Sequence, residues 1–420
     1  RQFERENLIP ILEKIKESSL DLSNKIIEQN QSLMANHSTF ILYLFKRFNL
    51  GIDDKIFFDQ YQKYFEEFNP VNYDPVKWAK AAKKAGMKYA VLTTKHHEGF
   101  CLFDSKYTDY KATNTKANRD LVKEFVDAFR AEGLKVGFYY SLIDWHHPDF
   151  TIDRNHPQRP VSEDDYDALN AGKDMNKYRT YLHNQVRELL TNYGKIDILW
   201  YDGNWPYTWE EWDSKKLNSM VRKHQPEIII NDRSGLPEDF DTPEQYIIPS
   251  ERNWECAMPI SDFWWGYNKG DKFHKNTYRV LKDLIHCICH GGNFILNIGP
   301  KRNGEIEKID EKTLKEVGKW IKENKESIYG VKKFMAPPPS PRVTHFGFYS
   351  KKGNKIFLYV FYWNKDFVFA NVKGKVKKIY YLKDNKKIDF KQEKEKIYFL
   401  NLPEKPLDKY VTVIVIELLP

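Results

Sequence analysis

Residues 120–141, DLVKEFVDAFRAEGLKVGFYYS, contain the pattern that decides the fold. Asp120 is a favourable helix N-cap, apolar side chains recur at helical spacing over residues 121–129, and Gly133 follows as a helix-ending glycine. An apolar run, Val136 to Tyr139, comes directly after it. The stretch therefore predicts a helix followed at once by a buried strand.

The same helix-then-strand unit recurs on both sides of this stretch. One predicted helix begins at Asp74-Pro75 and ends at Gly86, and another covers residues 178–193. Apolar runs follow at residues 89–92 and 196–200, and later runs lie at 228–230 and 294–298. This repetition is typical of an α/β fold with a parallel sheet covered on both faces. We assign residues 56–336 to a (β/α)8-like, TIM-like catalytic barrel, because the block has the length of one such domain.

A proline cluster separates the barrel from the rest of the chain. Residues 337–341, PPPSP, cannot continue a helix or a sheet ladder. Beyond it, short runs with alternating polarity lie at residues 355–362, 367–372, 376–382, 396–400 and 410–417. We therefore assign residues 337–420 to a small C-terminal β-sandwich.

Composition excludes several classes of protein. The chain has 420 residues, of which 41% are hydrophobic, so wholesale disorder is excluded. No apolar run reaches the roughly 18 residues of a membrane span, and no secretory signal follows the charged residues 1–6, so we expect a cytoplasmic protein without a membrane partner. Four cysteines do not indicate a disulfide framework, and the excess of Lys and Glu fits the surface of a thermophile's protein.

The net charge of +8 raises the question of a nucleic-acid partner. Lysines are spread over the whole chain, and the densest stretch, residues 351–396, alternates with strand-like apolar residues. A solvated sheet face explains this pattern, and no phosphate-binding loop or zinc-ribbon spacing accompanies it. We therefore predict no nucleic-acid partner.

Polar and aromatic residues stand just after the predicted strands. In a (β/α)8 barrel the carboxyl ends of the strands form the active face. The sequence therefore predicts a functional site built from these stretches: residues 95–98 (KHHE), Ser141 with residues 145–147 (WHH), residues 202–205 (DGNW), residues 231–233 (NDR) and residues 299–300 (GP).

Asp202 is the carboxylate that stands out, because it lies between Trp200 and Trp205. A strand-end aspartate is often only an N-cap or turn residue. The functional alternative is a catalytic carboxylate of a sugar hydrolase, which needs one carboxyl at the anomeric carbon and a second to protonate the leaving oxygen. Aromatic walls suit the apolar faces of a sugar ring.

Metal sites are the other chemistry that the residues suggest. We expect His96 and His97 to point in opposite directions at a strand end and so to form a poor chelate. The stretch from Cys287 to His290 continues a helical run, which favours a buried helix end over a zinc site. We predict no metal and no cofactor, and a metal-dependent hydrolase using His96, His97, His146 and His147 is the least favoured alternative.

A set of motifs resembles the α-L-fucosidases of glycoside hydrolase family 29 from about residue 61 to residue 330. The most specific are KHHEGF at residues 95–100 and GGNFILNIGP at residues 291–300. The others are YDPVKW at residues 73–78, AGMKY at 85–89, RDLV at 119–122, GFYYS at 137–141, LWYDG at 199–203, NDR at 231–233 and WWGY at 264–267.

The resemblance implies a retaining exo-glycosidase that removes terminal α-L-fucose from a fucosylated oligosaccharide or glycoconjugate through a covalent fucosyl-aspartate. Asp202 matches the family's nucleophile. Residues that match fucose-binding or lining positions are His96, His97, Tyr139, Arg233, Trp200 and Trp265.

The acid/base residue is assigned less directly by the resemblance. Glu244 matches the acid/base position of some family members, and Glu251, Glu255 and a residue upstream of Tyr61 are the alternatives. A retaining mechanism predicts that the two catalytic carboxyls lie about 5–5.5 Å apart.

The resemblance fails at the N-terminus. The family's first strand reads Lys-Phe-Gly-Ile-Phe-x-His-Trp-Gly, and the chain has no such motif; its one early histidine is His37. Residues 1–55 favour helices instead, so we interpret them as a divergent or non-native segment. Loss of this strand would leave an unpaired edge in the core sheet. The alternative function is therefore a fucose-binding or vestigial barrel without hydrolase activity.

Assembly as a homo-oligomer is compatible with the sequence.

Overall fold

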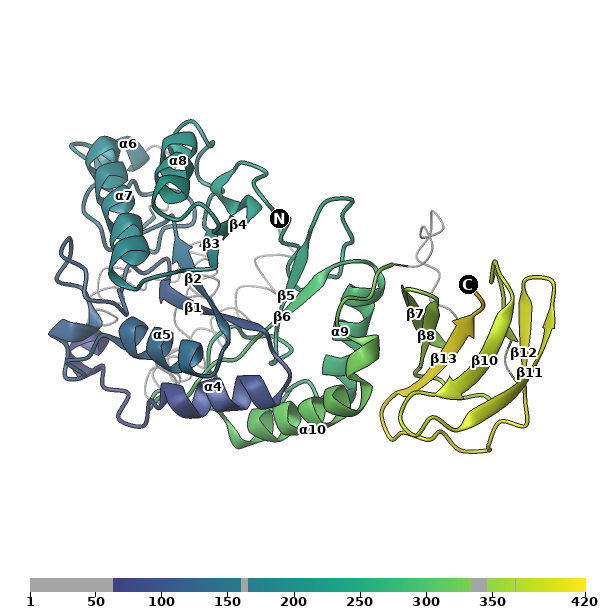
Figure 1. Ribbon diagram of the computed structural model, residues 1–420. Coiled ribbons are helices and arrows are strands. Elements are labelled where there is room, and N and C mark those ends of the chain that lie inside the picture. Colours follow the sequence, from purple (N-terminus) through teal and green to yellow (C-terminus); the bar gives the residue numbers. More distant parts are fainter. Residues whose placement is uncertain (1–62, 160–164, 334–345, 367) are drawn as a thin grey trace, which may run out of the picture.

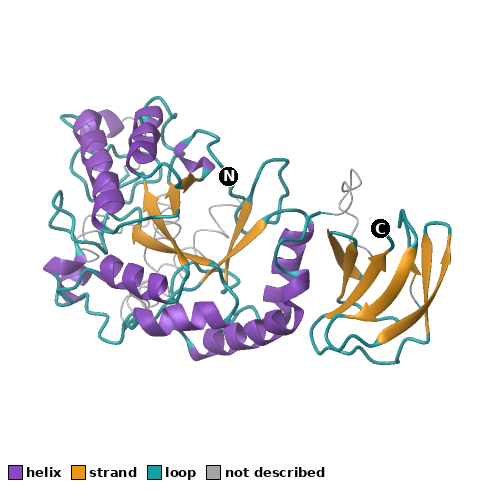
Figure 2. Ribbon diagram, in the orientation of Figure 1, coloured by secondary structure: helices purple, strands orange, loops and turns teal. Residues whose placement is uncertain are grey.

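The computed structural model describes residues 63–420 except 160–164, 334–345 and 367. The segment 1–55 and the proline cluster at 337–341 thus lie outside the described residues. The described chain forms an α/β part followed by an antiparallel β part, as Figures 1 and 2 show. This arrangement confirms the predicted α/β fold with parallel strands and a C-terminal β domain. The described residues include no helix long and apolar enough to cross a membrane.

Parallel strands of the α/β part form two sheets. One sheet has the order β1-β2-β3-β4, and the other pairs β5 with β6. The paired register places Thr93 beside Tyr139, Tyr139 beside Trp200, and Ser141 beside Asp202. The strands are β1 (Tyr89–Lys95), β2 (Lys135–Ser141), β3 (Ile198–Asp202), β4 (Ile229–Ile230), β5 (Glu255–Pro259) and β6 (Asn293–Asn297).

Helices alternate with these strands and cover the sheets from outside. The Asp74 and Asp120 side chains accept the backbone N–H groups of Lys77 and Lys123, so both act as the predicted N-caps. Gly86 and Gly133 follow the helix ends with positive φ, as helix-ending glycines do. The longer helices are α4 (Pro75–Lys84), α5 (Leu121–Ala131), α7 (Met175–Asn192), α8 (Ser214–His224), α9 (Thr277–Cys289) and α10 (Lys308–Asn324).

Strand β5 is one of the elements that the sequence pattern did not reveal, and the one that matters most for the site. Its residues, ECAMP, mix a carboxylate and a cysteine with apolar side chains and end in proline, so neither alternation nor an apolar run marks it. All five side chains are nevertheless buried. The segment 240–244 forms isolated bridges with Asn231, Trp254 and Ala257 and thereby connects the end of β4 to β5.

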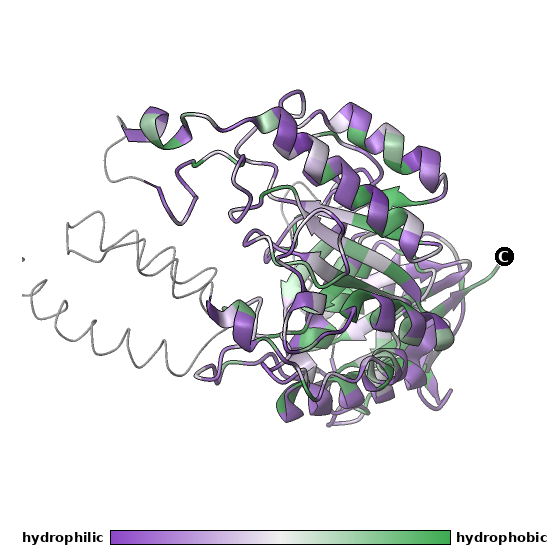
Figure 3. Cartoon of the chain, turned by 90° about the vertical axis from the view of Figure 1, so that its left-hand side faces the viewer, coloured by the Kyte–Doolittle hydropathy of each residue, from purple (hydrophilic) through white to green (hydrophobic). Residues whose placement is uncertain are grey.

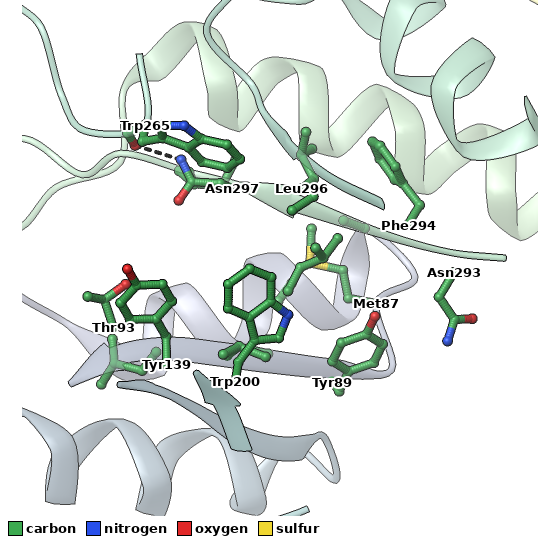
Figure 4. Close-up of a pocket in the computed structure, with 18 of the residues that line it drawn as sticks. Met87, Tyr89, Thr93, Tyr139, Trp200, Trp265, Asn293, Phe294, Leu296 and Asn297 are labelled. Atoms are coloured by element: carbon green, nitrogen blue, oxygen red, sulfur yellow. Dashed lines mark hydrogen bonds between the residues drawn. The ribbon is translucent and has the colours of Figure 1, made fainter. Parts of the chain in front are cut away.

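The other edges of the two sheets face each other across a cavity. Within the described residues β1 pairs only with β2, and β6 pairs only with β5. The cavity between them has a volume of about 980 Å³ and is lined by side chains of both strands and of the helices behind them. Figure 4 shows Tyr89 and Thr93 on one side and Phe294 and Leu296 on the other. Residues 1–62, where the family's first strand would lie, are outside the described residues, so the unpaired edge expected from the sequence stays a prediction.

Hydrophobic residues concentrate on the strands, and the outward helix surfaces are mostly hydrophilic (Figure 3). The largest core cluster packs α5 and α7 against the first sheet, with Phe125, Phe129, Val136, Leu182 and Leu199 among its members. Burial of these faces stabilises the fold by roughly 25 cal/mol for each Å² of apolar surface removed from water. The amphipathic pattern of residues 121–129 is therefore the pattern that attaches α5 to the sheet.

Seven antiparallel strands form the C-terminal part, in the order β7-β8-β13-β10-β11-β12-β9. One face of this sheet has its own core, and the other packs on α9 and α10 through Val280, Trp320, Phe357 and Val413. The strands are β7 (Gly347–Lys352), β8 (Lys355–Val360), β9 (Val368–Phe369), β10 (Val376–Tyr381), β11 (Lys387–Glu393), β12 (Lys396–Leu400) and β13 (Thr412–Leu418).

Candidate active site

Asp202 lies at the carboxyl end of β3, on the wall of the cavity between the two sheets. Its Oδ1 accepts Arg233 Nη1 at 2.8 Å, and its Oδ2 accepts the Tyr139 hydroxyl at 2.6 Å. Burial raises the pKa of Asp202, but Arg233, His97 and the Tyr139 hydroxyl outweigh it and lower the pKa below its ordinary value. Asp202 is therefore an ionised, hydrogen-bonded carboxylate, as a nucleophile must be.

Arg233 connects this carboxylate to a second one. The residue lies in the short 3-10 helix after β4, and its Nη2 contacts Glu244 Oε2 at 2.7 Å. The Nε and Nη2 atoms of Arg233 also donate to Thr242 Oγ1 and to the Thr242 carbonyl at 3.0 and 3.1 Å. The guanidinium thus lies between Asp202 and Glu244 and contacts both.

The two adjacent histidines do not point in opposite directions, so that expectation was wrong. Strand β1 ends at Lys95, and His96 and His97 lie in the turn that follows, where the alternation of a strand no longer applies. Their ring centroids are 4.0 Å apart. Both rings line the cavity that contains Asp202.

His97 is neutral, and its surroundings determine which ring nitrogen carries the proton. Burial, the neighbouring His96 and nearby cations hold the pKa of His97 well below its ordinary value. The Ser141 hydroxyl donates to the Ile143 carbonyl at 2.7 Å, so it accepts a hydrogen bond from His97 Nδ1, also at 2.7 Å. The His97 Nε2 atom, 3.8 Å from Asp202, is then free to accept a hydrogen bond from a sugar hydroxyl.

His96 differs from its neighbour in charge. Its Nδ1 contacts Glu98 Oε2 at 3.2 Å. Burial lowers the pKa of His96, but the hydrogen bond and charge of Glu98, with Asp202 and Glu244 beyond, raise it above the ordinary value. The His96 ring also stacks on Tyr139 at 5.7 Å. His96 therefore takes up a proton more readily and can donate hydrogen bonds, whereas the neutral His97 beside it can accept one.

The three glutamates considered for the acid/base role lie in different surroundings. Glu244 lines the cavity with Asp202, on a segment whose Gln245 N–H bonds the Ala257 carbonyl of β5. Glu251 is 90% exposed and contacts Lys333, away from the cavity. Glu255 is only 4% exposed and bonds Tyr89 and Trp200.

Aromatic side chains form the wall of the cavity beside Asp202. Trp200 lies below Arg233, whose guanidinium carbon is 4.6 Å from the indole centroid, and stacks on Tyr139 at 5.6 Å. Trp265 faces them from the other side (Figure 4), where its carbonyl accepts Asn297 Nδ2 at 2.6 Å. All eight residues proposed for the site from the sequence line this one cavity.

Several further residues complete the site. Glu98 contacts His96, Thr242 fixes the Arg233 guanidinium, and the exposed Trp205 packs edge-on against His97 at 5.2 Å. Glu98 belongs to the quoted motif KHHEGF, and Thr242 lies two residues before Glu244, so closeness in sequence to a candidate residue is the signal that identifies both.

One group of side chains in the described residues has the spacing of a metal site: His96, His97 and Asp202, with ligand atoms within 4.8 Å of one another. The Arg233 guanidinium already neutralises Asp202, and a second cation there would be repelled. His146 stacks on Tyr110 and His147 packs on Tyr181, so the four histidines do not converge. Cys287 and Cys289 are buried in the last turn of α9, as expected.

The fold and the site together define a glycoside hydrolase: parallel strands present two carboxylates, histidines and aromatic walls at their carboxyl ends. Comparison with known proteins agrees. The family model described as alpha-L-fucosidase matches residues 47–326. Human tissue alpha-L-fucosidase is 28% identical over 366 residues, which cover 82% of this chain and 74% of the human protein.

Solved structures give the same result. Alpha-L-fucosidase isoenzyme 1 from Paenibacillus thiaminolyticus superposes with a TM-score of 0.80 at 41% identity, covering 86% of this chain and 90% of that one. A Bacteroides thetaiotaomicron alpha-L-fucosidase of family GH29, trapped as a covalent intermediate, superposes with a TM-score of 0.73 at 26% identity, covering 86% of each chain. The chain belongs to the α-L-fucosidase family, and its activity is α-L-fucoside hydrolysis. These matches favour the enzyme over a vestigial barrel.

Proposed function

We propose that the chain hydrolyses terminal α-L-fucosides of oligosaccharides or glycoconjugates with retention, using Asp202 as the nucleophile and Glu244 as the acid/base. The observation that carries this proposal is the single Arg233 guanidinium that contacts both carboxylates, at 2.8 and 2.7 Å. It brings the two groups required for double displacement to one end of one cavity.

In the first step a carboxylate oxygen of Asp202 attacks the anomeric carbon. The bond from that carbon to the leaving oxygen breaks, and Glu244 gives its proton to that oxygen. In the second step Glu244, now ionised, takes a proton from water, and the water oxygen displaces Asp202 from the anomeric carbon. L-fucose leaves, and both carboxyls return to their starting protonation states.

The remaining residues bind the sugar in this proposal. The neutral His97 accepts a fucose hydroxyl at Nε2, and His96, Tyr139 and Arg233 bind the other oxygens. Trp200 and Trp265 present apolar surface to the sugar ring. Because Tyr139 and Arg233 also contact Asp202, sugar binding and the charge of the nucleophile depend on the same side chains.

Trapping the intermediate tests the assignment of the nucleophile. The enzyme is incubated with 2-fluoro-fucosyl fluoride, digested and mapped by mass spectrometry. We expect one fluorofucosyl group on the peptide that contains Asp202, with loss of activity in proportion to labelling. A label on another carboxylate, or inactivation without a label on Asp202, would overturn the proposal. The Asp202→Asn variant is the control and should take up no label.

A further inference from the structure

Glu255 is a buried carboxyl that the proposed mechanism does not use. It is the first residue of β5, and its side chain crosses the interior to the other sheet. There Oε2 bonds the Tyr89 hydroxyl of β1, and Oε1 accepts Trp200 Nε1 of β3 at 3.2 Å. Glu255 is therefore a polar connection between the two parallel sheets directly behind the catalytic cavity.

The surroundings of Glu255 contain few groups that could stabilise a negative charge. Tyr89 faces it from β1, Trp200 from β3 and Asn293 from β6, where the two residues are in register. The backbone N–H of Glu255 donates to the Asp241 carbonyl at 2.9 Å. Burial, without a compensating cation among the described residues, raises the pKa of Glu255 to about 8.

The Glu255 carboxyl accepts a hydrogen bond from each partner. Its Oε1 accepts the indole N–H of Trp200, and its Oε2 accepts the Tyr89 hydroxyl. Glu255 bonds the indole edge of Trp200 and does not line the cavity that contains Asp202, so our proposal gives the acid role to Glu244, which does. What Glu255 controls directly is the orientation of Trp200.

The orientation of Trp200 matters for Asp202. The two side chains that hydrogen-bond Asp202 both lie against this indole: Arg233 above its face at 4.6 Å and Tyr139 stacked on it at 5.6 Å. They hold Oδ1 and Oδ2 of the carboxylate. A rotation of the indole would therefore displace both groups that keep Asp202 ionised.

We propose that Glu255 is a positioning residue for the reaction: its carboxyl fixes the Trp200 indole, against which Arg233 and Tyr139 are aligned to Asp202. This inference rests on the proposed role of Asp202. Glu255 touches neither the sugar nor the reacting atoms, and it acts through Trp200.

Steady-state kinetics over a range of pH test the proposal with three variants. Glu255→Leu removes the acceptor, Glu255→Gln keeps an acceptor of the same shape, and Trp200→Phe removes the donor. We expect Glu255→Leu to lower kcat at least about tenfold with KM changed less than about threefold. Glu255→Gln should recover most of that loss. The double variant Glu255→Leu/Trp200→Phe should be no slower than the slower single variant, because both changes break one interaction.

The pH profile separates positioning from a merely structural role. In Glu255→Leu the acid limb of kcat/KM should move to higher pH, since a misaligned Arg233 and Tyr139 stabilise ionised Asp202 less. In Glu255→Gln the acid limb should lie close to that of the parent, because the amide oxygen still accepts the Trp200 indole N–H. If Glu255→Leu does not fold, as judged by its melting curve, Trp200→Phe, which removes the donor of the same hydrogen bond, takes its place and should show the same shift of the acid limb.

Three outcomes would overturn the proposal: unchanged kcat and acid limb in folded Glu255→Leu, an acid limb in Glu255→Gln shifted as far as in Glu255→Leu, or additive losses in the double variant. Failure of the proposed function looks different, because the parent enzyme would then carry no label on Asp202 in the trapping experiment.

Discussion

Arg233 donates to Glu244 across 2.7 Å while its other terminal nitrogen holds Asp202. The guanidinium helps to lower the pKa of Asp202, which must be ionised to attack the anomeric carbon. In our proposal Glu244, the other carboxylate that Arg233 contacts, is the acid/base.

Removal of the nucleophile should abolish turnover and permit chemical rescue. We expect Asp202→Gly to lower kcat for an aryl α-L-fucoside by about 10³-fold or more. The cavity left by the side chain admits azide, which attacks the sugar directly and gives β-L-fucosyl azide. The product is identified by NMR. Near-normal turnover of the variant would remove Asp202 from the nucleophile role.

Glu244 should reveal its role through the leaving group. We expect Glu244→Ala to slow cleavage of fucosyl oligosaccharides by about 10²- to 10⁴-fold, the usual contribution of general acid catalysis, and cleavage of activated aryl fucosides far less. Azide should intercept the covalent intermediate and give α-L-fucosyl azide, the opposite anomer from the Asp202→Gly product.

The exposed Glu251 provides the matched control for this experiment. Glu251→Ala removes a carboxylate from the same loop region, outside the cavity. If Glu251→Ala, rather than Glu244→Ala, shows the dependence on the leaving group, the acid/base assignment is wrong.

Loss of Arg233 should shift the acid side of the pH profile. Burial raises the pKa of Asp202 and Arg233 is the largest influence that lowers it, so in Arg233→Met the pKa rises. Asp202 is then protonated at a higher pH, and the acid limb of kcat/KM moves upward. Arg222→Met is the control, because Arg222 binds Glu238 and Asp239 outside the cavity. Equal shifts in both variants would contradict this explanation.

Chelation should leave the activity unchanged. His96, His97 and Asp202 have the spacing of a metal site, but Arg233 already supplies the positive charge. We expect dialysis against EDTA to reduce the rate of aryl-fucoside hydrolysis by less than about one fifth. A large loss that zinc or another divalent cation restores would show that the cluster binds a metal.

The ion pair between Lys95 and Asp144 should contribute strongly to stability. The atoms Nζ and Oδ2 are 3.0 Å apart, and the side chains are 0% and 1% exposed. Asp144 also accepts the backbone N–H groups of His146 and His147. Asp144→Ala would leave a buried, unpaired lysine, at a cost of about 3–5 kcal/mol in the free energy of unfolding.

A surface ion pair provides the comparison for this measurement. Lys123 and Asp127 form an exposed pair on α5, so Asp127→Ala should cost less than about 1 kcal/mol. Urea denaturation measures both variants. Equal costs would show that burial does not set the strength of the Lys95–Asp144 pair.

The sequence predicted those elements whose patterns are local. The caps Asp74 and Asp120 and the runs after them identify α4, β1, α5 and β2 without tertiary information. Strand β5 escaped prediction because it contains a glutamate, and the reason for that glutamate is its contacts with Tyr89 and Trp200, 166 and 55 residues away. Long-range partners of this kind have no signature in a single sequence.

In the candidate site, too, local patterns were predictable from the sequence and long-range contacts were not. Strand ends predicted that Asp202, Arg233 and the two histidines would meet, because parallel strands place their carboxyl ends together. The direction of His96 was predicted wrongly, since the turn after Lys95 replaces strand alternation. The role of Thr242 in fixing Arg233 was not predicted, because the Arg233 guanidinium reaches Thr242 from the 3-10 helix after β4, and the sequence does not show this contact.

The packing of the C-terminal sheet has a consequence for protein engineering. Its strands β8 and β13 share a core with α9 and α10, and Trp320 of α10 donates its indole N–H to the Val411 carbonyl at 3.0 Å. Helix α9 leads into β6, which lines the catalytic cavity. A shortened enzyme ending near residue 333 would therefore expose an apolar helix surface and form aggregates, so a minimal catalyst must retain the sheet.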